Sequence, residues 1–115
     1  MATYKQEEFI REVLIELGVL DATEAPEAED SEHVSRRMSQ KFSELYDEGL
    51  IPFDIDGDIP GRYFLPLVAL VAVECATSYG VPLEAVAIKA AAGTRSLWKL
   101  RQKPHISTPA QADYF

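Results

Sequence analysis

The chain of 115 residues has the length of one domain, and its 47% hydrophobic content argues against a disordered protein. The net charge of −8 is unevenly divided: residues 1–60 hold sixteen acidic and five basic side chains, whereas residues 61–115 hold three and six. The acidic first half argues against nucleic-acid binding, which requires clustered cations. The single cysteine excludes a disulfide within the chain. The N-terminal residues lack a signal-peptide pattern, so we expect a cytoplasmic setting.

Apolar residues recur at helical spacing in the first half of the chain. They predict a helix over residues 4–17, with Thr3 as its N-cap, and a second over about residues 27–48, with Pro26 at its first position. A glycine follows each segment and is expected to end the helix. Two prolines and two glycines predict an irregular loop at residues 50–62, with a brief extended piece around residues 53–56.

The third predicted helix, residues 63–79, is apolar almost all round, which is typical of a helix covered on several sides. Pro66 is expected in its first turn and Gly80 at its end. The most apolar part, residues 64–76, is too short for a membrane span and contains Glu74. We therefore expect a buried helix and no membrane partner.

A fourth helix is predicted over about residues 83–101, and small residues at 90–93 would let another helix approach closely. Its expected apolar face consists of Leu83, Val86, Ala87, Ala90 and Leu97. Two prolines and no helical period predict an extended tail over residues 103–115. The predicted fold is therefore all-α: a compact bundle of about four helices in a domain of residues 1–102, followed by an extended C-terminal arm.

The side chains that could carry chemistry do not form a site in the sequence. Cys75 lies in the apolar helix, where burial raises the thiol pKa, and this favours a structural role over a nucleophilic one. Glu74 beside it should either pair with Arg62 or Arg95 or lie on an exposed strip of the helix.

Metal and phosphate patterns also fail. The acids at 54, 56 and 58 resemble a calcium loop, but Gly57 falls at position four and Leu65 at position twelve, so turn hydrogen bonds explain the acids better. One cysteine with His33 and His105 cannot complete a zinc site, and no phosphate loop is present. We therefore predict no catalytic, cofactor-binding or metal-binding residue, and no enzyme.

Three stretches follow one another in order along the chain. They are LGVL at 17–20 with EAPEAED at 24–30, IP and YF at 59–64 with LVALVA at 67–72, and YGV at 79–81 before an alanine-rich helix. In order and spacing they resemble the head-to-tail connector, or adaptor, proteins of tailed bacteriophages, which are called packaged-DNA stabilisation proteins in short-tailed phages. The resemblance covers about residues 6–102.

The resemblance implies an all-helical, non-enzymatic virion subunit that is assembled in the host cytoplasm. Such subunits form a ring, commonly of twelve copies, that docks on the portal protein, receives tail or tail-completion proteins, and lets DNA pass through its channel without sequence-specific binding. Residues 103–115 would be the arm that reaches the portal. The candidate portal-binding residues are Lys103, His105, Ile106, Tyr114 and Phe115.

Two other classes of function are compatible with the sequence. A helical protein-binding or regulatory module of a cellular or prophage-encoded protein would be distinguished by a gene neighbourhood without portal, capsid and tail genes. A small enzyme using surface carboxylates would need acids close together in a concave pocket. The acidic and basic halves fit contacts between neighbouring copies, and an acidic surface beside a channel would not hold DNA.

Overall fold

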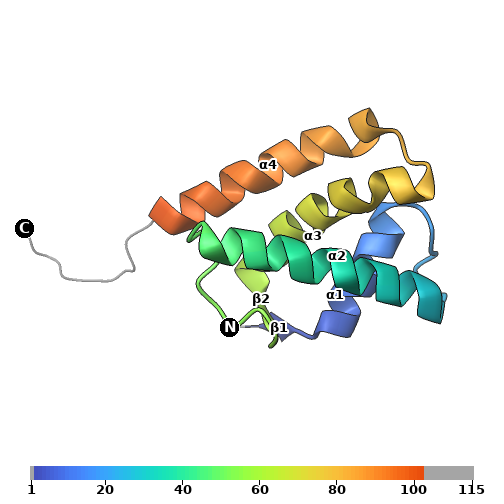
Figure 1. The fold of residues 1–115 in the computed structure, drawn as a ribbon, viewed down its shortest axis with the longest axis horizontal. Coiled ribbons are helices and arrows are strands. Elements are labelled where there is room, and N and C mark those ends of the chain that lie inside the picture. The colour runs from blue at the N-terminus through green and yellow to red at the C-terminus, as the bar shows by residue number, and fades with distance from the viewer. Residues whose placement is uncertain (1, 103–115) are drawn as a thin grey trace, which may run out of the picture.

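The computed structural model describes residues 2–102 (Figure 1). Its elements are β1 (Thr3–Tyr4), α1 (Gln6–Glu16), α2 (Ala28–Asp47), β2 (Ile59–Pro60), α3 (Gly61–Cys75), the 3-10 helix η1 (Ala76–Tyr79) and α4 (Leu83–Gln102). Four α-helices dominate and the two short strands pair antiparallel, so the predicted all-α bundle is confirmed. The predicted arm, residues 103–115, lies outside the described residues.

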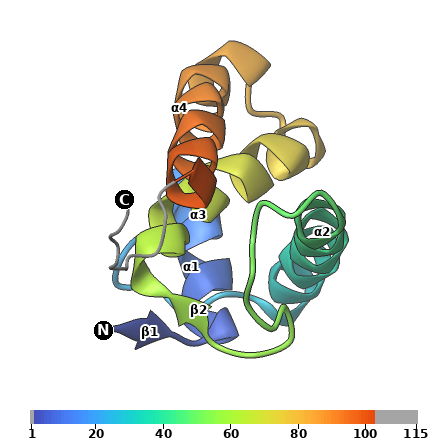
Figure 2. The same ribbon diagram turned by 90° about the vertical axis from the view of Figure 1, so that its left-hand side faces the viewer.

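Helix α3 is the centre of the molecule and lies between α4 and the pair formed by α1 and α2 (Figure 2). On the α1–α2 side the core is aromatic: Phe9 meets Phe42 edge-on at 5.3 Å and Phe64 at 5.7 Å between ring centroids. By length and composition alone, Gly61–Tyr79 could cross a membrane. The burial of residues such as Leu67 and Val71 in this core accounts for that composition, as predicted.

Glycines in the left-handed conformation end the helical segments at the predicted places. At Gly18, with φ of 76°, the N–H donates to the Ile15 carbonyl, and the Val19 N–H donates to the Leu14 carbonyl, both at 3.0 Å. These two hydrogen bonds satisfy carbonyl groups that have no partner within the helix, and the chain turns back toward the core. The same arrangement occurs after α2 and η1, at Gly49 and Gly80.

The predicted helix starts were wrong at two places. Thr3 is not an N-cap, because it belongs to β1 and pairs with Pro60; α1 instead begins after Lys5, whose N–H donates to the Glu8 carboxylate at 3.0 Å. Pro26 lies before α2 rather than at its first position, because Glu27 is still extended there.

The loop and the start of α3 also differ from the prediction. The extended piece is β2 and not residues 53–56, where the Asp54 carboxylate accepts a hydrogen bond from the Asp56 N–H at 3.0 Å and closes a turn. Helix α3 begins at Gly61, directly after β2, so Pro66 falls in its second turn rather than its first. At the other end, the last predicted turn winds as η1.

Candidate functional site

Helix α4 is attached to the rest of the molecule by a narrow stripe. Its buried positions are Val86, Ala90, Gly93 and Leu97, which repeat at three- and four-residue spacing and face α3. Two residues of the predicted apolar face, Leu83 and Ala87, are exposed instead. The prediction failed there because α4 packs mainly on α3 and η1, so only one stripe of the helix is covered.

The helices α3 and α4 approach each other closely at Gly93. A Cβ atom added to this glycine would lie 2.8 Å from the carbonyl oxygen and 3.4 Å from the Cα atom of Pro66. Real Cβ atoms essentially never lie so close to a backbone oxygen, so this position needs glycine. The predicted close approach at residues 90–93 is therefore confirmed, and its partner is α3.

A groove runs along one side of this contact. Its wider part has a volume of about 340 Å³ and is lined by Glu16, Leu65, Pro66, Val68, Ala69, Lys89, Ala92, Gly93 and Ser96. A second hollow of about 320 Å³ shares Pro66 and Ser96 and adds Arg62, Lys99 and Leu100. We call the two together the α3–α4 groove. Its middle is apolar, and it is basic at the end where Arg62 and Lys99 lie.

Charge is separated in space as well as in sequence. Helix α4 carries Lys89, Arg95, Lys99 and Arg101 against the single acid Glu84, and it lies across α3 from the acidic α1 and α2 (Figure 2). The two regions meet at one end of the groove, where the Lys89 ammonium lies 2.6 Å from the Glu16 carboxylate. The guanidinium of Arg101 stacks over the Trp98 ring at 5.3 Å.

Large apolar side chains are exposed around α4. Among the described residues, the large exposed hydrophobics are Tyr46, Leu65, Leu83, Ile88 and Trp98, and all but Tyr46 belong to α3 or α4. Ile88 is 79% exposed and Leu65, at the edge of the groove, is 68% exposed. Exposed large apolar side chains on one helix are candidate contact points for a partner. This exposure was not predicted from the sequence, although Ile88 and Trp98 lie outside the stripe that repeats along α4.

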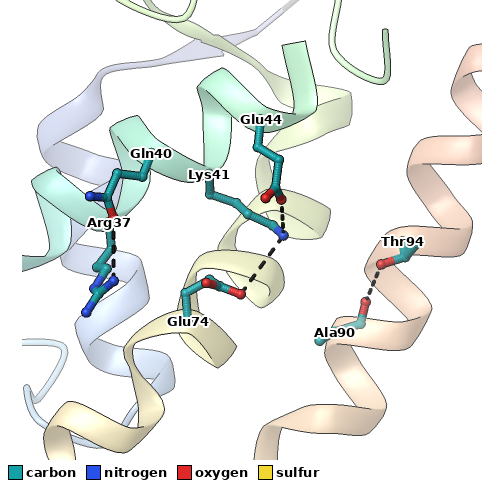
Figure 3. Close-up of polar contacts among 7 residues, drawn as sticks. All are labelled: Arg37, Gln40, Lys41, Glu44, Glu74, Ala90 and Thr94. Carbon is teal, nitrogen blue, oxygen red and sulfur yellow. Dashed lines mark hydrogen bonds and ion pairs between the residues drawn. The ribbon is translucent and has the colours of Figure 1, made fainter. Parts of the chain in front are cut away.

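Cys75 and Glu74, the two side chains of α3 considered for catalysis, have structural roles. Burial raises the pKa of Cys75 to about 11, and the Arg37 charge only partly opposes this, so the thiol is protonated at neutral pH. The Glu74 carboxylate is exposed, which agrees with the prediction that it lies on an exposed strip of the helix. Its ion pair, at 4.0 Å, is with Lys41 of α2 (Figure 3), whereas the sequence pointed to Arg62 or Arg95.

The same contacts fasten α3 and η1 to α2. The Lys41–Glu74 pair joins α3 to α2, and the Tyr79 hydroxyl of η1 donates to the Asp30 carboxylate of α2 at 3.0 Å. Within α2, Lys41 also lies 2.8 Å from Glu44 (Figure 3). Burial first, and then the hydrogen bond to Asp30, raises the pKa of Tyr79 to about 12. Within residues 2–102, no three His, Cys, Asp or Glu side chains gather to hold a metal ion.

The predicted portal-binding residues, 103 and beyond, lie outside the described part of the chain. Helix α4 places their starting point, because it ends at Gln102, beside the basic end of the groove at Lys99 and Leu100. Comparison with family models, with curated proteins and with solved structures gives no match to this chain.

Proposed function

We propose that this protein is a structural, non-enzymatic subunit that docks other protein subunits, and that it acts as a head-to-tail adaptor between the portal and the tail of a bacteriophage. The observation that carries the proposal is the surface of α4. This helix is held by one stripe and displays basic and large apolar side chains across the molecule from the acidic helices α1 and α2. The order of the LGVL, LVALVA and YGV stretches supports the choice of adaptor.

Two faces of opposite charge on one subunit favour a head-to-tail contact between copies. The basic α4 of one copy would meet the acidic α1–α2 face of the next, and a contact between two different faces closes into a ring when the rotation allows it. Complementary potentials would also steer this encounter. Acidic side chains turned toward the channel would leave DNA free to slide, because a phosphate grip requires clustered cations.

In this proposal, residues 103–115 form the arm that reaches the portal, with Tyr114 and Phe115 as its apolar anchors and Lys103, His105 and Ile106 as further contacts. Aromatic side chains dominate the energetics of many protein interfaces. The other face of the ring would receive tail or tail-completion proteins. The protein would then reside at the head–tail interface of the virion.

Electron microscopy of the protein mixed with portal complexes tests the ring. We expect extra ring-shaped density below the portal, and we expect the double charge reversal Arg95→Glu with Lys99→Glu to abolish it. Arg36→Glu on α2, where the side chain is 64% exposed, is the control: it adds charge of the sign that the α1–α2 face already carries, so it should leave the ring intact. Finding only monomers beside bare portals, with the protein in large excess over the portal, would refute the adaptor function.

Truncation tests the arm separately. Deleting residues 104–115 should leave the helical content unchanged, because α4 ends at Gln102, and should abolish attachment to the portal. Circular dichroism measures the first result and co-sedimentation with portal complexes the second. Normal co-sedimentation of the truncated protein would show that the arm has another role.

A further inference from the structure

We infer that the α3–α4 groove is the docking site of the protein's own arm, residues 103–115, whose aromatic pair Tyr114 and Phe115 enters the apolar middle of the groove. This goes beyond the proposed function, because it concerns the isolated protein and requires no portal. It also assigns a role to the apolar middle of the groove, between α3 and α4, which the charged ring contact does not explain.

The groove has the shape and chemistry for an aromatic side chain. Its volume of about 340 Å³ is formed by apolar atoms of Pro66, Val68 and Ala69 on one wall and of Ala92 and Gly93 on the other. Leu65 stands at its edge with 68% of its surface exposed, so an occupant would cover a large apolar side chain. Removing that apolar surface from water is favourable, and an aromatic ring brings a large apolar surface of its own.

The arm starts in the right place and is long enough. It leaves α4 after Gln102, beside the basic end of the groove. From there to Lys89, at the other end, α4 rises by about 20 Å at ~1.5 Å per residue. Thirteen extended residues span about 43 Å at ~3.3 Å per residue, so Tyr114 and Phe115 reach the apolar middle after the chain has turned back.

Charge and connectivity favour the same occupant. Asp113 precedes the aromatic pair, and Lys99, at the basic end of the groove, offers this carboxylate a cationic neighbour. Lys89, at the other end, is already paired with Glu16. Because the arm is joined to the groove by a short segment, its effective concentration there is on the order of millimolar. A weak contact is therefore sufficient, and a partner that binds Tyr114 and Phe115 has to compete with it.

A nitroxide label on the full chain, at Ala112→Cys, tests the contact by nuclear magnetic resonance. Cys75 is completely buried, so the label goes to position 112. We expect selective broadening of the amide signals of Ala69 and Ser96 in the groove, while the signal of Arg36 on α2 stays sharp. A spectrum in which the label broadens no groove signal, or broadens all signals alike, would overturn the inference.

Two neighbouring residues of α4 provide matched variants. Ala92→Glu places a charge inside the groove and should remove the broadening, whereas Ala91→Glu makes the same change on the exposed face and should keep it. Equal broadening in both would refute the site. Should Ala92→Glu unfold, the pair Tyr114→Ser and Phe115→Ser leaves residues 2–102 unchanged and must abolish the broadening as well.

A mixed sample separates contact within one chain from exchange between copies. Isotope-labelled protein without nitroxide is combined with nitroxide-labelled protein of natural isotope content. No broadening is expected in this sample, because each groove is filled by its own arm. Broadening of the groove signals here would overturn the intramolecular contact. Neither result depends on portal binding, so failure of this inference is distinguishable from failure of the adaptor proposal.

Discussion

The two sides of α3 are packed in different ways. Toward α1 and α2 it meets large side chains, and the rings of Phe9 and Phe42 are completely buried. Toward α4 it meets a stripe that includes the small residues Ala90 and Gly93, and the backbones lie close together at Gly93. Burying a large aromatic ring removes more apolar surface from water than burying a small residue does, whereas small residues let two helix backbones approach closely. The first side therefore supplies more apolar burial per residue, and the second leaves the outer face of α4 exposed.

The largest loss of stability is expected from a substitution in the aromatic core between α3 and the helices α1 and α2. Phe42→Ala should lower the free energy of unfolding by about 3–5 kcal/mol, because it opens a cavity between rings that contact each other edge-on. The matched change on the other side, Ile88→Ala, removes a side chain that is 79% exposed and should stay within about 0.5 kcal/mol. Denaturant unfolding followed by circular dichroism measures both. Similar losses would mean that α4 is as much a part of the core as α2.

The same contrast explains what the sequence could predict. The helix stops at Gly18 and Gly80 and the buried central helix follow from local backbone preference and from a nearly uniform apolar composition, and both were predicted correctly. The covered stripe of α4 was predicted only in part, because it depends on which helix lies beside α4. For the same reason the groove and the Lys41–Glu74 pair, which join segments far apart in the chain, had no sequence signal.

The next effect concerns the stability of the core at high pH. Burial raises the pKa of Cys75 from 9.0 to about 11, so the folded state holds this proton more tightly than the unfolded state does. The resulting stabilisation is fully present below pH 9 and is lost as the pH rises through 11. Two pKa units correspond to at most about 2–3 kcal/mol. Tyr79, whose pKa is raised from 10.0 to about 12, adds a loss in the same direction at higher pH.

Unfolding free energies at pH 8 and pH 10.5 measure this loss, and the variant Cys75→Ala is its control. The variant is less stable at pH 8, because it leaves a cavity. Its stability should fall less steeply with pH than that of the wild type, since the buried thiol no longer titrates. Parallel curves for the two proteins would show that Cys75 does not carry the effect.

A smaller effect is expected where α3 and α4 cross. Gly93→Val places a branched side chain against the Pro66 carbonyl and should cost about 1–3 kcal/mol, because the helices must move apart. Ala91→Val makes a comparable change on the exposed face and should cost no more than about 0.7 kcal/mol, from helix propensity alone. Hydrogen exchange should quicken in α4 of the first variant while α1 and α2 stay protected. Uniform quickening would show that the two sides unfold together.

The smallest effect belongs to the link between the two regions, the ion pair of Glu16 and Lys89. Its atoms lie only 2.6 Å apart, but the side chains are 25% and 65% exposed, so water and salt screen the attraction. A double-mutant cycle with Glu16→Gln and Lys89→Met should give a coupling of about 0.2–1 kcal/mol that shrinks as salt is added. A coupling near zero would mean that the stripe facing α3 positions α4 by itself. A coupling well above that range would mean that α1 helps to hold α4, and the division between a rigid core and an accessible docking helix would then be less sharp than the packing indicates.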